Sequence, residues 1–490
     1  MHKNKIIVTG ENSRAKLLKG ADMVADLVKL TLGPKGRNVV FTQEHGLYPT
    51  VTNDGVSIAR NVFSDDEIEQ VGIDLIKQAS MQTSYHAGDG TTTSMVLAQA
   101  IAHAGFEACE VTSPMEVKKQ IERECELVVQ ELKALARPVD NFGQMVMVAS
   151  AAAESEEWGK TVAQVFQDVG PNGVVTVDQT PEVGVRAVIT TGLEVQEGWI
   201  SSYMINSEKN EAIIEDARIL ICDQKLTTIK DIVPLIEKLS KQGINKLVVV
   251  CDGMDNNLIA TAAINKQKGT FEILGIKLPY TEKQEFMENI AAVTGASITG
   301  TTGLMIDQID IAELGFCNKV VATQESTLFI GGSGDISTLV ASLEKTKEDT
   351  KDKYFISKAE TRLAKLSGGV GVIWVGAATE AEMKYTKLKI DNAVSSLKCA
   401  MEEGIVPGGG LTLSKLSTIQ GGYPLIAECL HAPIKQMQAN AGGEFIVPDN
   451  IFDPVKVTRT ALQNACSLAA TLITVEAVIA DKYEHTTITE

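Results

Sequence analysis

The sequence predicts a multidomain α/β protein, in which helical segments at both ends of the chain flank a middle region of alternating strands and helices. The chain has 490 residues, which is too long for one hydrophobic core and suggests about three domains. Apolar residues recur at helical spacing in 64–82 and 114–136, before Pro138 breaks the pattern. Short β-rich runs then alternate with helical patterns, which is typical of an α/β domain.

The individual elements follow from local patterns along the chain. Apolar residues at helical spacing predict a first helix from Ala15 to Val28, which ends before a Gly-Pro turn. Another such run follows residues 87–93 and predicts a helix through Ile101. Strands are predicted at 173–177, 219–221, 246–250, 271–274 and 370–375, and a helix at 378–401. The C-terminal region returns to a helical pattern.

Composition excludes several classes of protein. The formal net charge of −18 argues against a nucleic-acid partner, because phosphate backbones are bound by basic patches. The eight cysteines are scattered without a C-x-x-C pair, which predicts free thiols in a reducing cytosol. We see neither the apolar run of a membrane helix nor the pattern of a signal peptide. We therefore expect a cytoplasmic protein with no nucleic-acid partner and no membrane contact.

Residues 87–93 form the segment with the clearest chemistry. They combine Gly88, Asp89, Gly90 and three threonines directly before a helical run. Glycine lets the backbone approach a ligand closely, and a helix N-terminus attracts anions such as phosphate. A single carboxylate beside a phosphate suits Mg²⁺, which completes its shell with water and phosphate oxygens. A glycine-rich turn with a threonine helix cap would show the same residues.

Two further polar turns precede this segment. Residues 31–38 carry two glycines, Lys35 and Arg37, and residues 52–56 carry Asp54. A complete Walker A pattern does not occur in the chain. The phosphate-binding interpretation therefore rests on the three turns taken together.

The three turns, in this order, resemble those of the group I chaperonins (GroEL type). Further segments that match the family are 368–369, 375–380, 402–410 and 453–459. The resemblance extends from about Arg14 to about Ala480 and implies a GroEL-like multidomain α/β fold.

The resemblance implies three domains. Residues 1–137 and 405–490 would form a mostly α-helical equatorial domain that binds ATP and forms the ring. Residues 138–191 and 370–404 would form a small α/β intermediate hinge domain. Residues 192–369 would form an α/β apical domain that binds polypeptides.

The resemblance also assigns the residues of a nucleotide site. Asp89 would bind Mg²⁺ and Asp54 would position the attacking water. The residues that would contact the nucleotide are Leu32, Gly33, Pro34, Gly90, Thr91, Thr92, Thr93, Gly409 and Asp453. ATP and Mg²⁺ are the expected cofactors, with K⁺ as an optional second cation.

Asn392 occupies the position of the family's catalytic aspartate. An amide can hold a water molecule but cannot accept its proton, and a general base contributes about 10²–10⁴ in rate. Asp391 stands one residue earlier, but neighbouring helix residues point about 100° apart. Asn53 stands where a lysine is expected, which removes a cation near the phosphates. The sequence therefore predicts Mg–ATP binding with slow hydrolysis, unless Asp391 or Asp54 takes over after a small helix shift.

An apolar surface that captures unfolded chains is expected in the middle region. The resemblance assigns it to Trp199, Tyr203, Met204, Val233, Ile236, Ile259, Ala263 and Ile264. The spacing of Val233 and Ile236, and of Ile259 and Ala263, puts each pair on one helix face. Ordinary core packing of two amphipathic helices would give the same pattern.

The resemblance implies a homo-oligomeric, heptameric ring, single or double, that folds non-native polypeptides in a cavity and could take a co-chaperonin. The family's intersubunit salt bridge cannot form, because both positions are acidic, at Glu197 and Glu380. Segment 420–424 is shorter than in the family, which leaves the contact between rings open. The rival interpretation is a non-hydrolysing holdase or scaffold ring, which Asn392 favours and the retained Asp89 opposes.

Overall fold

The computed structural model describes residues 5–42, 49–170, 173–207, 209–228, 230, 232–300, 306–349, 353–418, 424–443, 446–448 and 450–481. The shortened segment at 420–424 lies almost entirely outside the described residues. The chain divides into two compact units. Unit 1 comprises Met1–Gln164, Val177–Arg186 and Trp374–Glu490, and unit 2 comprises Val165–Thr176 and Ala187–Ile373.

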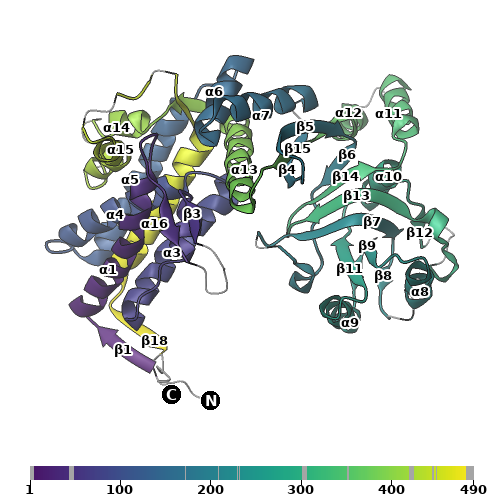
Figure 1. Ribbon diagram of the computed structural model, residues 1–490, viewed down its shortest axis with the longest axis horizontal. Coiled ribbons are helices and arrows are strands. Elements are labelled where there is room, and N and C mark those ends of the chain that lie inside the picture. Colours follow the sequence, from purple (N-terminus) through teal and green to yellow (C-terminus); the bar gives the residue numbers. More distant parts are fainter. Residues whose placement is uncertain are drawn as a thin grey trace. The chain divides into compact units, whose positions relative to one another are not determined.

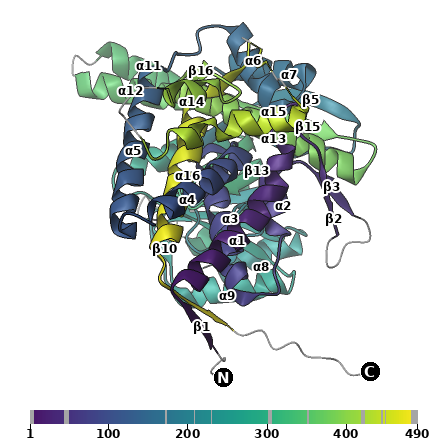
Figure 2. The ribbon, with the colours of Figure 1, turned by 90° about the vertical axis from the view of Figure 1, so that its left-hand side faces the viewer.

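Unit 1 is built mainly from helices packed around α16. Its first helices are α1 (Glu11–Val28), α2 (Gly55–Arg60), α3 (Glu67–Ala87), α4 (Thr91–Ala108) and α5 (Pro114–Ala134). The others are α6 (Phe142–Ala153), α13 (Glu380–Glu403), α14 (Leu411–Leu416), α15 (Ala432–Ala441) and α16 (Val455–Thr474). Helix α16 contacts α3, α4 and α5, and Figures 1 and 2 both place it among them. It is buried on most of its surface because its sequence is rich in Ala, Leu and Val.

Local sequence explains where these helices begin and end. Asp66 caps α3 by accepting hydrogen bonds from the backbone N–H groups of Ile68 and Glu69. Ser113 caps α5, where Pro114 takes the first helical position. The expected helices at 64–82, 114–136 and 378–401 are confirmed as α3, α5 and α13, each within a few residues at its ends.

Three small sheets complete the helical part of unit 1. Strand β1 (Lys5–Thr9) pairs antiparallel with β18 (Ala477–Asp481), and β2 (Val39–Phe41) pairs with β3 (Thr50–Thr52). Strand β16 (Ile405–Pro407) pairs antiparallel with β17 (Phe452–Pro454). The expectation of a wholly helical C-terminal region is wrong at β17 and β18, because the partners of these short strands lie far away in the sequence.

Helix α7 (Glu156–Val169) and a three-stranded sheet cross the division between the units. The sheet has the order β4–β15–β5 and consists of β4 (Val174–Gln179), β15 (Val370–Gly376) and β5 (Gly184–Thr190). The strands expected at 173–177 and 370–375 are confirmed as β4 and β15.

Unit 2 contains a seven-stranded mixed sheet with the order β11–β9–β7–β13–β14–β6, and β12 (Ile298–Thr299) pairs with β7. The strands are β6 (Gly192–Val195), β7 (Ala212–Cys222), β9 (Lys246–Cys251), β11 (Glu272–Lys277), β13 (Gly315–Ala322) and β14 (Thr327–Gly332). Strands β7, β9 and β11 are parallel, which confirms the α/β pattern expected here. Their continuous apolar runs are buried on both faces, as parallel strands require.

Helices of unit 2 lie around this sheet (Figure 1). They are α8 (Val233–Lys241), α9 (Asn256–Gln267), α10 (Lys283–Thr294), α11 (Ser337–Asp349) and α12 (Lys353–Ser367). Helix α10 contacts β6, β7, β13 and β14, so it packs on the half of the sheet that ends at the edge strand β6. Helix α9 contacts the edge strand β11. The sequence analysis did not predict β13 and β14, because it identified strands by the helical patterns that separate them.

Candidate functional site

A cavity of about 620 Å³ lies within unit 1, where several separate stretches of the chain meet. The expected nucleotide contacts that line it are Leu32, Gly33, Pro34, Gly90, Thr93, Gly409 and Asp453, together with the expected metal ligand Asp89. Other lining residues that the argument below uses are Asn53, Ser150, Glu154, Met437 and Val457. The structure therefore brings most of the expected site residues around one space.

The turn between α3 and α4 forms one wall of the cavity. Gly88 and Gly90 both adopt left-handed backbone conformations, with φ of 67° and 81°. A Cβ atom on Gly90 would lie 2.7 Å from Cγ1 of Val457, so both the conformation and the packing require glycine here. The turn presents Asp89 at the N-terminus of α4, where free N–H groups favour anions.

Asp89 is held by two hydrogen bonds. Its Oδ1 accepts a bond of 2.7 Å from the Gly90 N–H, and its Oδ2 accepts one of 2.6 Å from Oγ of Ser396 on α13. Burial has the largest effect and raises the pKa of Asp89, and the charge of Asp54 adds to this rise. The two hydrogen bonds and the charge of Lys389 oppose the rise but do not cancel it. The sequence analysis missed Ser396, because its contact joins residues far apart in the chain.

The arrangement fits a magnesium ion that arrives with a nucleotide. No group of three or more His, Cys, Asp or Glu side chains that could hold a metal occurs among the described residues. Asp89 instead stands as a single carboxylate beside the free N–H groups of α4. Mg²⁺ is commonly bound in this way, by one or two carboxylates plus phosphate oxygens and water.

The β16–β17 pair forms another part of the cavity wall. It sets Val406 opposite Asp453, and the N–H groups of Gly409 and Gly410 donate hydrogen bonds to the Asp453 carboxylate. Burial and the nearby charge of Asp89 raise the pKa of Asp453 to about 6. A Cβ atom on Gly408 would lie 2.6 Å from Oδ1 of Asp453, so this close approach depends on glycine.

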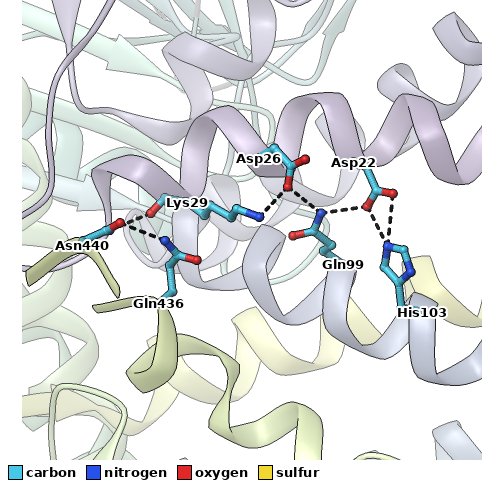
Figure 3. Close-up of polar contacts among 7 residues, drawn as sticks. All are labelled: Asp22, Asp26, Lys29, Gln99, His103, Gln436 and Asn440. Atoms are coloured by element: carbon cyan, nitrogen blue, oxygen red, sulfur yellow. Dashed lines mark hydrogen bonds and ion pairs between the residues drawn. The ribbon is translucent and has the colours of Figure 1, made fainter. Parts of the chain in front are cut away.

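A side chain of α15 (Ala432–Ala441) holds the Leu32–Pro34 loop in place. Nδ2 of Asn440 donates to the backbone oxygens of Lys29 and Leu32, both at 2.9 Å. Figure 3 shows a line of polar contacts that leads away from this bond through Lys29, Asp26, Gln99 and Asp22 to His103 on α4. Asn440 was not identified from the sequence, although it keeps the predicted loop in place.

Helix α6, Glu154 directly after it and Asn53 supply a further wall. Glu154 follows α6, and its carboxylate accepts a bond of 2.6 Å from Nζ of Lys389 and bonds of 3.3 Å from Nδ2 of Asn53. The Tyr385 hydroxyl donates to the same carboxylate at 3.4 Å. Glu154 and Lys389 were not among the expected site residues, because only the fold brings α6 and α13 together.

Four of the expected residues are not among those that line the cavity. Thr91 and Thr92 form the first turn of α4, and Gly55 lies close against their hydroxyl oxygens. Asp54 caps α2, with Oδ2 accepting from the backbone N of Ser57 at 2.8 Å and from its Oγ at 2.6 Å. Asn392, the fourth, lies on α13.

Positions along α13 show how Asn392 relates to the cavity. It lies one turn from both Lys389 and Ser396, which contact Glu154 and Asp89. Asp391 lies one turn from Ser395, which packs against Gly88. The two neighbouring residues therefore belong to different rows of the same helix.

Two buried polar atoms of the cavity wall lack hydrogen-bond partners. These atoms are Oδ1 of Asn53 and Oγ of Ser150. Buried polar atoms are nearly always satisfied by protein or water, and an orphan atom in a cavity wall indicates a ligand or an ordered water. The cavity is therefore suited to a polar ligand.

Comparison with known proteins identifies the family and the fold. Residues 24–419 match the TCP-1/cpn60 chaperonin family. The chain belongs to this family. The fold is shared with chaperonin gp146 from the bacteriophage EL 2 (Pseudomonas aeruginosa), crystallised in the presence of ATP-BeFx in two forms. Crystal form II gives a TM-score of 0.64 at 17% identity over 98% of this chain and 100% of that chain. Form I gives a TM-score of 0.62 at 18% identity over 97% and 99%.

Unit 2 of this chaperonin carries the residues expected to bind polypeptides. Tyr203 and Ile264 are 71% and 51% exposed. A cavity of about 200 Å³ lies between α8 and α9 and includes Ile236. Side chains that are partly buried are those of Trp199, Val233, Ile236, Ile259 and Ala263.

Met204 requires a correction. It is only 5% exposed, and its sulfur accepts a hydrogen bond of 3.1 Å from the Gly275 N–H. A flexible thioether fills an irregular gap in a core well, so its side chain packs inside unit 2 instead of contributing to the surface. Among the described helices of both units, none is long and apolar enough to cross a membrane.

Proposed function

We propose that the chain is a subunit of a group I type chaperonin that binds Mg–ATP in the unit 1 cavity. The observation that carries this proposal is the shared cavity itself. It brings Asp89 and Gly90 at the start of α4 together with Asp453 and Gly409, although these pairs lie far apart in the sequence. The presence of ATP-BeFx in both crystal forms of the phage chaperonin supports the same ligand class.

Each part of the cavity has a defined task in this proposal. The N–H groups at the start of α4 and the hydroxyls of Thr91, Thr92 and Thr93 bind phosphates, and Asp453 binds the ribose. Asp89 holds Mg²⁺, which neutralises phosphate charge when bound. Asp54 orients water. Hydrolysis is slow because Asn392 cannot accept a proton.

The remaining features of the proposal concern the whole assembly. The subunits form a homo-oligomeric, heptameric ring in the cytoplasm that captures non-native polypeptides and folds them in a cavity. The equatorial, intermediate and apical domains are those of the sequence analysis. Capture takes place on the apolar side chains of α8 and α9 and on Tyr203, and a co-chaperonin would bind the same surface.

The direct test is steady-state phosphate release by the purified assembly, with Asn392→Asp measured in parallel. We expect the wild type to be slow and Asn392→Asp to be at least tenfold faster, since about 1.4 kcal/mol of barrier corresponds to tenfold. Fast release by the wild type with no change in the variant would show that hydrolysis is not limited at this position.

A second candidate is a ring that holds clients passively and does not hydrolyse ATP. Two observations favour it, namely Asn392 and the acidic pair at Glu197 and Glu380. Binding of Mg–ATP without phosphate release, in both the wild type and Asn392→Asp, would select this candidate.

A further inference from the structure

We propose that Glu154 is the carboxylate that accepts the proton of the attacking water and helps Asp54 to orient it, in the absence of an aspartate at position 392. This inference rests on the proposed function, because it concerns ATP bound in the unit 1 cavity. It extends that function by naming the group responsible for the residual hydrolysis.

The carboxylates that line the cavity differ in their hydrogen-bond partners and in their exposure. Among the described residues, those that line it are Asp89, Glu154 and Asp453. Asp89 is bound by Gly90 and Ser396 and is the candidate metal ligand. Asp453 is bound by the N–H groups of Gly409 and Gly410. Glu154 remains as the carboxylate that is open to the cavity, with 49% of its side chain exposed.

Asp54 is less suited to proton transfer than Glu154, because Glu154 lines the cavity and Asp54 does not. One of its oxygens already accepts two short bonds from Ser57, and the residue caps α2. A carboxylate engaged in capping can still align a water, but a new role as base would compete with the cap.

The backbone of Glu154 is held in an unusual conformation. It ends α6 with φ of 54°, in the left-handed region that non-glycine residues rarely adopt. Such strain persists only where the surrounding structure enforces it, and it is often found at functional sites. Here it directs the carboxylate to Lys389, Tyr385 and Asn53.

Lys389 gives the Glu154 carboxylate a partner that suits a phosphate site. The Lys389 side chain is 7% exposed, and its charge reaches Asp89, whose pKa it lowers. The lysine therefore supplies positive charge near the expected phosphates. It could replace the cation that is missing at Asn53, where the family resemblance leads us to expect a lysine. Its ammonium group would shield the phosphate charge from Glu154.

The wall beside Glu154 can also hold the water. Oδ1 of Asn53 is buried without a hydrogen-bond partner, while Nδ2 of the same amide donates to Glu154. A water beside this pair would donate one proton to Oδ1 of Asn53 and the other to the Glu154 carboxylate. This arrangement orients a lone pair of the water oxygen towards a reacting atom.

The proposed step balances as follows. The water oxygen forms a bond to the γ-phosphorus of ATP while its proton passes to the Glu154 carboxylate. The bond between the γ-phosphorus and the β,γ-bridging oxygen breaks, and ADP leaves with that electron pair. Glu154 then returns the proton to solvent, and the products are ADP and inorganic phosphate.

The test compares Glu154→Gln with Glu157→Gln in the full assembly. Glu157 is an exposed glutamate in the first turn of α7 that does not line the cavity, so it is a matched control. We measure phosphate release and, by calorimetry, the binding of Mg–ADP. Glu154→Gln is expected to lower phosphate release by about 10² with Mg–ADP affinity nearly unchanged, as the loss of a general base requires. Glu157→Gln should match the wild type in both measurements.

The double variant Glu154→Gln/Asn392→Asp separates a chemical role from a structural one. If Glu154 replaces the absent aspartate, Asn392→Asp should restore at least tenfold of the lost rate. A merely structural Glu154–Lys389 ion pair would instead make Lys389→Gln and Glu154→Gln lose thermal stability equally, with no rescue.

Three outcomes would overturn the proposal. They are wild-type phosphate release in Glu154→Gln, failure of Asn392→Asp to restore a folded Glu154→Gln, and a wild type that binds Mg–ATP without releasing phosphate. The first two leave the proposed function intact, whereas the third also removes its ATPase part.

Discussion

The unit 1 cavity and the α8–α9 surface of unit 2 are built in opposite ways. Distant segments meet at the cavity, and glycines with positive φ and many short polar bonds fix its walls. The α8–α9 surface comes from neighbouring stretches of chain and presents partly buried or exposed apolar side chains. The difference teaches that a site for one defined ligand needs fixed polar geometry, whereas a surface for varied partners needs only accessible apolar area.

The largest effect is expected from removing the candidate metal ligand. Asp89→Asn should lower phosphate release by at least about 10², since in the proposed function it removes the charge that holds Mg²⁺ beside the phosphates. Capture of an unfolded protein on unit 2 should persist in the same variant, as measured by suppression of aggregation without nucleotide. Loss of both properties together would show that the two regions are not separable.

Replacing Asp453 tests whether the buried carboxylate in the cavity lowers the free energy of unfolding. Its pKa lies at about 6 in the folded protein, above the usual 3.8. The carboxylate therefore destabilises the fold at pH values above 6, and the penalty disappears as pH falls below 3.8. Asp453→Asn should raise the free energy of unfolding at neutral pH by roughly 2–3 kcal/mol.

Denaturant titrations of the nucleotide-free protein at pH values on both sides of this pKa would measure the effect. The stabilisation by Asp453→Asn should shrink as the medium becomes more acidic. Equal stabilisation at every pH would indicate improved packing instead of a removed charge.

A smaller effect is expected from the unit 2 surface. Ile236→Ser removes an apolar side chain from the wall of the α8–α9 cavity. Client binding should weaken by about 1 kcal/mol, because part of the side chain is already buried within the unit. Fluorescence titration with an unfolded protein measures this, and Mg–ADP affinity serves as the control that should stay constant. A fall in nucleotide affinity alone would contradict the division of tasks.

The smallest effect is expected at His103, at the far end of the polar line in Figure 3. The hydrogen bond to Asp22 raises the pKa of His103 above 6.5, and the negative charges of Asp22 and Asp26 raise it further. Burial and the positive charge of Lys29 oppose this rise. The stabilisation is therefore fully present below pH 6.5 and is lost as pH rises through the folded pKa. His103→Gln should lower stability at about pH 5.5 and have little effect at about pH 8.5. An effect that does not change with pH would exclude this explanation.

Local chemistry allowed the sequence to predict much of this structure. The turn at Gly88–Gly90, the glycines near Asp453 and the parallel strands of unit 2 all leave strong patterns over a few residues. Ser396, Asn440, Glu154 and Lys389 left no such pattern, because each acts on a residue far away in the chain. The position of Met204 could not be predicted either, since a methionine suits both a core and a surface.

The pairing of β1 with β18 sets an order on folding during synthesis. Unit 1 needs α16 at its centre and β18 at its edge, so it cannot close until Asp481, the last residue of β18, has left the ribosome. Unit 2 ends at Ile373 and can form earlier. Until unit 1 closes, the apolar faces of the helices α1, α3, α4 and α5 are exposed to solvent, so the nascent chain is prone to aggregation. A protein proposed to shelter unfolded chains would thus depend on such shelter while it is being made.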